Sequence, residues 1–124
     1  MIGVRDIDPG ELDFIRERRI KTFTSEDIYR LGIGTVIDEA AAYLTKQCDG
    51  IHLSFDFDVI DPKEACGVGT PVASGIDIET NLKAMRILAQ YKIITSAEFV
   101  ELNPLLDRDG ETATAALALI KALV

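Results

Sequence analysis

The chain has 124 residues, of which 48% are hydrophobic, so it is long enough to bury one core and too short for several domains. Its 21 acidic residues outnumber its 13 basic ones, and the formal charge of −8 argues against nucleic acid and anionic membrane surfaces as partners. No apolar segment reaches the length of a membrane span and the N-terminus lacks a signal-peptide pattern, so we expect a cytoplasmic protein.

Four short apolar runs rich in β-branched and aromatic residues predict strands. They cover residues 2–7, 20–23, 51–60 and 93–102. Each is followed by a segment with helical spacing of its apolar residues. These segments cover residues 9–19, 24–47, 77–92 and 109–124. Gly32 and Gly34 are expected to split the second segment into two helices.

The regular alternation of strands and helices predicts an α/β fold. Right-handed βαβ units build a parallel sheet with helices on both faces, which gives a three-layer αβα domain over residues 1–124. A sheet of about four strands is small for this architecture and leaves two open edges. The sequence therefore indicates that the chain is part of something larger.

The third apolar run ends in the acidic stretch "FDFDVIDP", residues 55–62. If the strand continues through it, Asp56 and Asp58 point to one side, and a turn at Asp61 and Pro62 places them at the carboxyl end, where open α/β sheets bind ligands. Two adjacent carboxylates favour a hard divalent cation such as Mn²⁺ or Mg²⁺. The alternative is a solvated pair that caps neighbouring turns.

Two further residues are weighed as members of this site. His52 shares the face of Asp56 but lies about 13 Å away along a strand, too far for one metal centre, so a structural histidine is expected. Glu101 ends the fourth apolar run, where the carboxyl ends of parallel strands meet, whereas Glu98 lies on the opposite face.

Taken together, the stretches "SFDFDVIDP", "GTPVASG" and "VELNP" and the opening "RDIDPGE" resemble the arginases of the ureohydrolase family. The resemblance extends over essentially the whole chain, but only the C-terminal half of an arginase is matched. It implies half of the arginase fold and Mn²⁺-dependent hydrolysis of L-arginine to L-ornithine and urea.

The resemblance also implies roles for six residues. Asp56 and Asp58 match two aspartates that bind the family's pair of manganese ions. Thr70 and Glu101 match residues at the guanidinium end of the substrate, where a carboxylate suits the fork of guanidinium donors. Asp8 and Glu11 match positions that recognise its α-amino end. Each of the last two could instead serve only the start of a helix, and Thr70 could be an ordinary loop residue.

The chain departs from the family in two ways. Cys66 stands where the family's metal loop usually has a proline. The family's histidine ligands, its DxHxD strand and its proton-shuttling histidine belong to an N-terminal half that is absent here, so no catalytic residue is assigned within this chain. We therefore expect a fragment that is inactive alone and binds metal weakly, and that associates with itself or with the missing half.

Three other functions remain open. Agmatinase, a sister enzyme, is disfavoured by "RDIDPGE", which suits a substrate with an α-amino acid head. A truncated, non-catalytic ureohydrolase module would use its sheet edge or helix faces for association. A Mg²⁺-dependent phosphatase also places DxD after a hydrophobic strand, but Asp107 and Asp109 are the only candidates for its second acidic pair.

Overall fold

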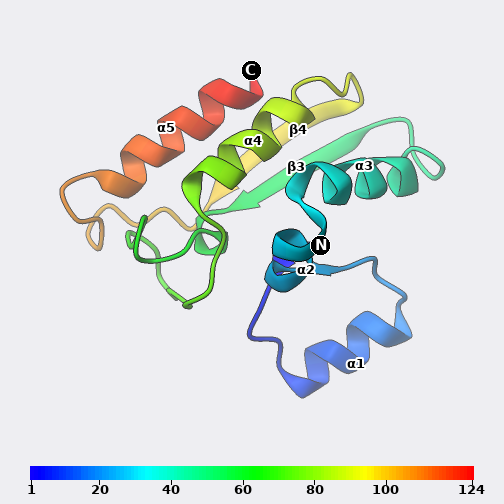
Figure 1. Ribbon diagram of the computed structural model, residues 1–124, viewed down its shortest axis with the longest axis horizontal. Coiled ribbons are helices and arrows are strands. Elements are labelled where there is room, and N and C mark those ends of the chain that lie inside the picture. The colour runs from blue at the N-terminus through cyan, green and yellow to red at the C-terminus, as the bar shows by residue number, and fades with distance from the viewer.

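A computed structural model describes residues 1–124, and its elements alternate in the predicted order (Figure 1). In chain order they are β1 (Ile2–Val4), α1 (Pro9–Glu17), β2 (Phe23–Thr24), α2 (Ser25–Leu31), α3 (Ile33–Leu44), β3 (Ile51–Asp56), a 3₁₀ turn (Phe57–Val59), α4 (Ile78–Leu88), β4 (Ile94–Val100) and α5 (Glu111–Leu123). A strand forms at each of the four predicted runs and is shorter than the run, and β2 overlaps its predicted run, residues 20–23, only at Phe23. None of the helices combines the length and the apolar character that a membrane-spanning helix requires.

Local sequence explains where the second helical segment begins and divides. Thr24 precedes α2 and accepts the N–H of Asp27, whose carboxylate accepts the Thr24 N–H in return at 3.0 Å. Gly32, with φ of 82°, separates α2 from α3, because side-chain-bearing residues rarely adopt that backbone conformation. The predicted division at this glycine is confirmed.

The four strands form two parallel pairs, β1–β2 and β3–β4. The α/β class and the parallel pairing agree with the sequence prediction, but the expected single sheet of about four strands is divided, because no strand pairs β1 with β3. One edge of β3 and one edge of β1 therefore have no strand partner.

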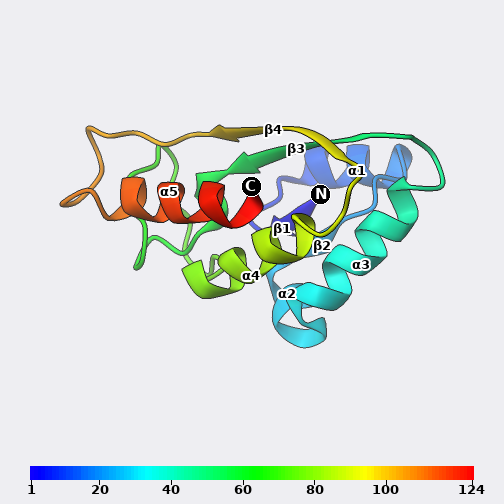
Figure 2. The same ribbon diagram turned by 90° about the horizontal axis from the view of Figure 1, so that it is seen from above.

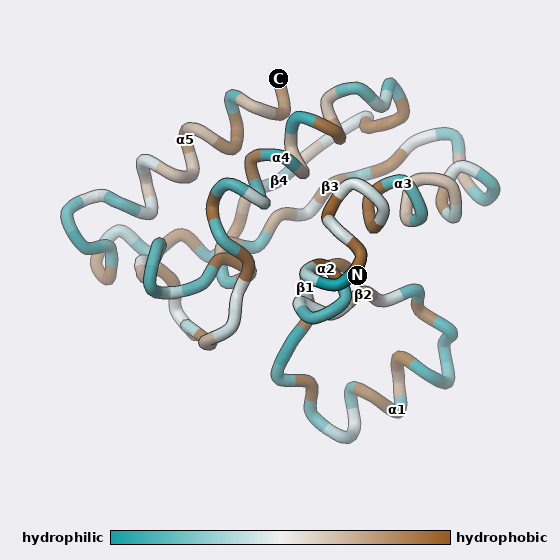
Figure 3. The backbone as a smooth tube through the Cα atoms, viewed as in Figure 1, coloured by the Kyte–Doolittle hydropathy of each residue, from teal (hydrophilic) through white to brown (hydrophobic).

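The β3–β4 pair lies on one side of the molecule with α4 and α5 packed beneath it (Figure 2). Eight buried residues form the core between these elements, and we call them the first core cluster. They are Phe55, Phe57, Ile60, Ala65, Val68, Met85, Ala116 and Leu119. The opposite face of the pair carries exposed side chains such as His52, Ser54 and Glu98, so the helical cover expected on both faces is present on one. This packing follows from the amphipathic pattern of α4 and α5, whose apolar residues face the core (Figure 3).

A second core cluster lies among β2, α2, α3 and α4. Its members are Phe23, Ile28, Ile33, Val36, Ile37, Ile76 and Ala84. Beside it runs a cavity of ≈ 580 Å³, mostly apolar, which we call the slot. Met1 and Ile2 of the β1 region line one wall, and every residue of β3 from Ile51 to Asp56 lines the other. The slot therefore occupies the space between the two strand pairs.

Candidate active site

The two central acids are held side by side by a turn rather than by strand alternation. The strand β3 ends at Asp56, whose side chain accepts the backbone N–H of Asp58 at 2.8 Å as the chain enters the 3₁₀ turn. Phe57 between them is 1% exposed and packs edge-on against Phe55, with ring centroids 5.3 Å apart. The expected continuation of the strand through Asp58 is wrong, because Asp56 forms a local side-chain-to-backbone turn there.

One oxygen of Asp58 has no partner within the chain. Its Oδ2 accepts a hydrogen bond from the hydroxyl of Thr70, whereas its Oδ1 is buried and unpaired. Burial raises the pKa of Asp56, and the nearby Asp58 carboxylate raises it further. A buried, unpaired carboxylate oxygen beside a second carboxylate fits a hard cation, which prefers oxygen donors.

Arg5 fixes the backbone of this turn, and the sequence analysis did not identify it. Its half-buried guanidinium donates to the carbonyl of Asp58 and, at 2.8 and 3.2 Å, to the carbonyl of Val72. It therefore ties the turn after β3 to the loop that carries Thr70. The available signal was its position directly after β1, because the end of a parallel strand faces the same edge as the end of β3.

The loop of residues 61–75 is joined to the segment after β4. Val68 pairs with Leu102 in an isolated bridge, and the Asn103 N–H donates to the Gly67 carbonyl at 2.8 Å. Glu101 has a left-handed backbone with φ of 67°, and its Oε2 lies 3.7 Å from the position that a Cβ on Gly69 would take. Strained backbone of this kind is common at functional sites.

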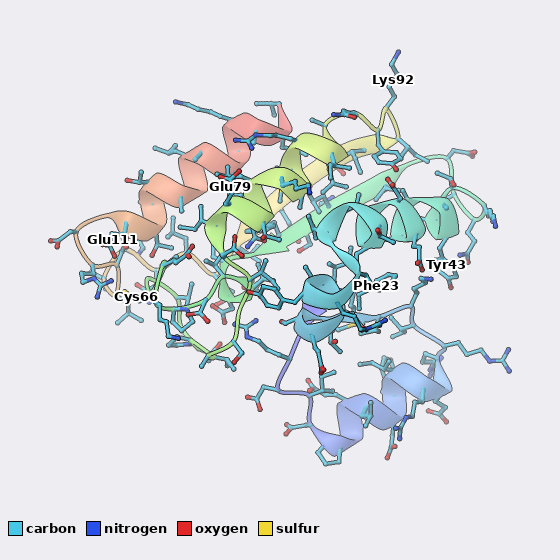
Figure 4. The ribbon with its side chains drawn as sticks, in the orientation of Figure 1. Phe23, Tyr43, Cys66, Glu79, Lys92 and Glu111 are labelled. Atoms are coloured by element: carbon cyan, nitrogen blue, oxygen red, sulfur yellow. The ribbon has the colours of Figure 1, made fainter.

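The structure thus brings four predicted residues to one place. Asp56 binds the Asp58 backbone, Asp58 binds Thr70, and the neighbour of Thr70 lies against Glu101. Cys66 lies in the same loop region (Figure 4), and its presence does not prevent Thr70 from reaching Asp58.

Asp8 and Glu11 are arranged differently. Both are exposed at the start of α1, where the Asp8 N–H donates to the Glu11 carboxylate at 3.0 Å. Neither makes a hydrogen bond or ion pair with the other four residues. In this structure the two residues stabilise the start of a helix, which is the alternative role that the sequence also allowed.

His52 is an exposed member of a polar group on the open face of the β3–β4 pair. Its Nδ1 is 2.8 Å from the Ser96 hydroxyl, and its Nε2 is 3.6 Å from Glu98. The hydroxyl of Ser54 also donates to Glu98, and this bond, followed by the contact with His52, lowers the pKa of Glu98. His52 therefore has structural partners across the strand pair.

Asp107, a residue that the phosphatase alternative requires, is used at the start of α5. Its two carboxylate oxygens accept the N–H groups of Thr112 and Ala113 at 2.8 and 3.0 Å. No group of three or more His, Cys, Asp or Glu side chains is arranged to hold one metal ion.

The sequence of this chain is similar to those of characterised proteins. A family model described as Arginase family matches residues 1–124. The arginase of Bacillus caldovelox is 50% identical over 99% of this chain and 41% of its own length, and that of Bacillus subtilis is 47% identical over 100% of this chain and 42% of its own. The chain thus spans about two fifths of the curated relatives that it matches.

Solved structures agree with this comparison. The native structure of the Bacillus caldovelox arginase superposes with a TM-score of 0.94 at 51% identity, covering 98% of this chain and 41% of that one. The Entamoeba histolytica arginase, solved in complex with L-ornithine, superposes with a TM-score of 0.93 at 38% identity, covering 98% of this chain and 41% of that one. The split arrangement of strands is therefore compatible with a part of that larger fold.

Proposed function

Because this chain belongs to the arginase family, we propose that it supplies the guanidinium-binding residues and part of the metal site of an enzyme that hydrolyses L-arginine to L-ornithine and urea. The single observation that carries the proposal is the Asp58 carboxylate. One of its oxygens accepts a hydrogen bond from Thr70, whose neighbour Gly69 lies close to Glu101, and the other is buried without a partner.

Asp56 and Asp58 would hold manganese through their carboxylate oxygens. The donor set fits, because Mn²⁺ accepts oxygen ligands and because the buried Oδ1 of Asp58 has no hydrogen-bond partner within the chain. When bound, the metal supplies the Lewis acidity that activates water near neutral pH. Arg5 keeps the Asp58 backbone and the Thr70 loop in fixed relation through its three hydrogen bonds.

Glu101 and Thr70 would orient the substrate. A carboxylate accepts two parallel hydrogen bonds from a guanidinium, and the exposed Glu101 is free to do so. The reaction adds water across the bond between the guanidinium carbon and Nε, which releases urea and leaves the ornithine amine. Asp8 and Glu11 would bind the α-amino end, a role that distinguishes L-arginine from agmatine. The ornithine complex of the Entamoeba histolytica relative supports an amino acid ligand.

A non-catalytic role is the second candidate, and the slot favours it. A ureohydrolase module whose strand pairs are separated by an apolar cavity could serve association alone.

The test is urea release from L-arginine with added Mn²⁺. The chain is assayed alone and after mixing with a separately expressed polypeptide, the part of the Bacillus caldovelox arginase that this chain does not match. We expect no urea from the chain alone, because two carboxylates chelate poorly, and measurable urea from the mixture. Replacing Glu101→Gln should abolish that activity. Agmatine as the faster substrate, or a folded mixture that makes no urea, would contradict the proposal.

A further inference from the structure

Arg5 lies where β1 meets the turn that carries the two acids. A Cβ on Gly3, earlier in the same strand, would lie 2.6 Å from the side chain of Val59, so β1 is packed directly against the turn after β3. From this fixed starting point the guanidinium of Arg5 donates to the carbonyls of Asp58 and Val72. The end of β1, the turn and the loop that carries Thr70 are therefore held together by one side chain.

The segment after Arg5 carries the proposed contacts to the α-amino end of the substrate. Only Asp6 and Ile7 separate Arg5 from Asp8. Asp6 has a left-handed backbone with φ of 55°, a conformation that costs free energy unless the surrounding structure holds it. Asp8 then caps α1, and Glu11 lies in the first turn of that helix.

The helix α1 does not itself fix this segment to the rest of the molecule. None of its residues is buried, and none of its apolar residues packs against either core cluster. The hydrogen bonds and ion pairs of residues 6–19 all stay within residues 6–20. Figure 1 shows α1 set apart from the other helices and joined to them by an extended segment at each end. The placement of Asp8 and Glu11 therefore depends on these attachments, and Arg5 anchors the one next to Asp8.

The hydrogen bonds of Arg5 suit a guanidinium better than an ammonium group. Nε and one Nη share the carbonyl of Val72, while the same Nη reaches the carbonyl of Asp58. A guanidinium presents these donors in a rigid planar fork, whereas lysine keeps the charge but carries it as a point on a flexible stem. Arg5→Lys therefore separates the geometry of the fork from the charge.

A substrate with a guanidinium at one end and an α-amino group at the other has to meet both ends of its site at a fixed separation. We propose that Arg5 is a positioning residue that sets this separation and thereby favours substrates with an α-amino group. It does so by holding the segment of Asp8 and Glu11 at a constant distance from the turn at Asp58. This inference deepens the proposed function and rests on it for the identity of the substrate.

The first measurement uses the 124-residue chain alone, without metal or substrate. Relaxation of the backbone amides by NMR gives order parameters, which are about 0.85 for rigid backbone and below about 0.6 for flexible backbone. Ile7 and Asp8 should be near the rigid value in the unaltered chain. Arg5→Lys should lower both below about 0.6. The control is Arg86→Lys, on an exposed residue of α4 that pairs with Glu79, and it should change neither.

The second measurement uses the mixture with the unmatched part of the Bacillus caldovelox arginase. Urea release is followed with L-arginine and with its desamino analogue, which keeps the guanidinium and the carboxylate and lacks the α-amino group. Arg5→Lys should lower the ratio of kcat/KM for L-arginine to kcat/KM for the analogue at least about tenfold, mainly through KM, because only L-arginine loses a contact. Arg86→Lys should leave this ratio unchanged.

Each outcome decides the matter. Lower order parameters together with a lower ratio support the positioning role of Arg5. Unchanged order parameters, an unchanged ratio, or an equal loss with both substrates overturn it, the last in favour of a role confined to the turn at Asp58.

Two further outcomes keep the inference separate from the proposed function. Should Arg5→Lys fail to fold by circular dichroism, the unaltered chain decides, because a flexible Ile7 and Asp8 would overturn the positioning role and rigid ones would support it. A mixture with the unaltered chain that makes no urea contradicts the proposed function, and the order parameters then still test Arg5.

Discussion

The two core clusters are similar in size and differ in how they are enclosed. The first has a strand pair above it and α4 and α5 below, and its members Phe57 and Leu119 are at most 1% exposed. The second has helices on one side and the slot on the other. The strands beside it are also shorter, three and two residues against six and seven.

The difference shows that packing alone completes one half of the molecule and not the other. In the first cluster, apolar burial and strand pairing stabilise the same elements. In the other half, α1 buries none of its residues, and each strand pair has an unpaired edge. Stability should therefore be concentrated around β3, β4, α4 and α5, and should fall toward α1.

The largest effect is expected from Phe57→Ala, in the first cluster. Deleting a ring that packs on Phe55 and Phe99 should lower the free energy of unfolding by about 3–5 kcal/mol. Phe14→Ala, on α1 where the ring is 52% exposed, should change it by less than about 0.5 kcal/mol. Urea-induced unfolding measures both. Equal losses would mean that the two regions are equally packed.

A smaller effect is expected from glycines in the two regions. A Cβ on Gly75 would lie 2.4 Å from the backbone nitrogen of Asp61, so Gly75→Ala should lower the free energy of unfolding by about 1–3 kcal/mol. Gly10→Ala in α1 meets nothing within 4 Å and should stabilise by up to about 1 kcal/mol. Thermal unfolding distinguishes them. A neutral Gly75→Ala would show that the loop joining the clusters is loose.

Addition of Mn²⁺ tests whether the metal binds at the carboxyl end of β3, near Asp58, or within the strand, near His52. At a Mn²⁺ concentration tenfold above its dissociation constant, the free energy of unfolding of the chain should rise by about 1.4 kcal/mol. Asp58→Asn should remove this gain, and His52→Ala should leave it, because His52 bonds to Ser96 instead. Differential scanning fluorimetry with and without a chelator measures the shift. The same loss in both variants would contradict the separate placement of the two residues.

The smallest effect concerns the open face. The pKa of Glu98 is lowered by the Ser54 hydroxyl and then by His52, so its contribution to stability is present above the ordinary glutamate pKa and is lost as pH falls through the lowered value. Ser54→Ala should raise the pKa of Glu98 toward its ordinary value. Carbon-detected NMR titration of the carboxyl group checks this, with Glu79, which bonds only to Arg86, as the reference residue. No change would mean that the bond does not persist in solution.

The sequence predicted the elements well and the site in part. Periodicity and glycine placement gave the order of strands and helices, including the division at Gly32, because these are local properties of the backbone. The same reasoning wrongly extended β3 through Asp58, since alternation assumes a strand and cannot foresee a side chain that ends it. Arg5 was missed because its hydrogen bonds join residues more than fifty positions apart.

What the sequence determined by itself is the family and the chemistry of the ends of the strands. Four short stretches carry the resemblance to arginases. The acidic residues at the strand ends could be identified as well, because their number and spacing are read directly from the sequence.

Only the tertiary structure decided which of them meet. It placed Thr70 on Asp58 and Gly69 against Glu101, and left Asp8 and Glu11 at the start of a helix. It also divided the strands around an apolar slot. The physical reason is that strand order and cavities arise from contacts between distant segments, and a periodic pattern in one segment carries no record of its neighbours.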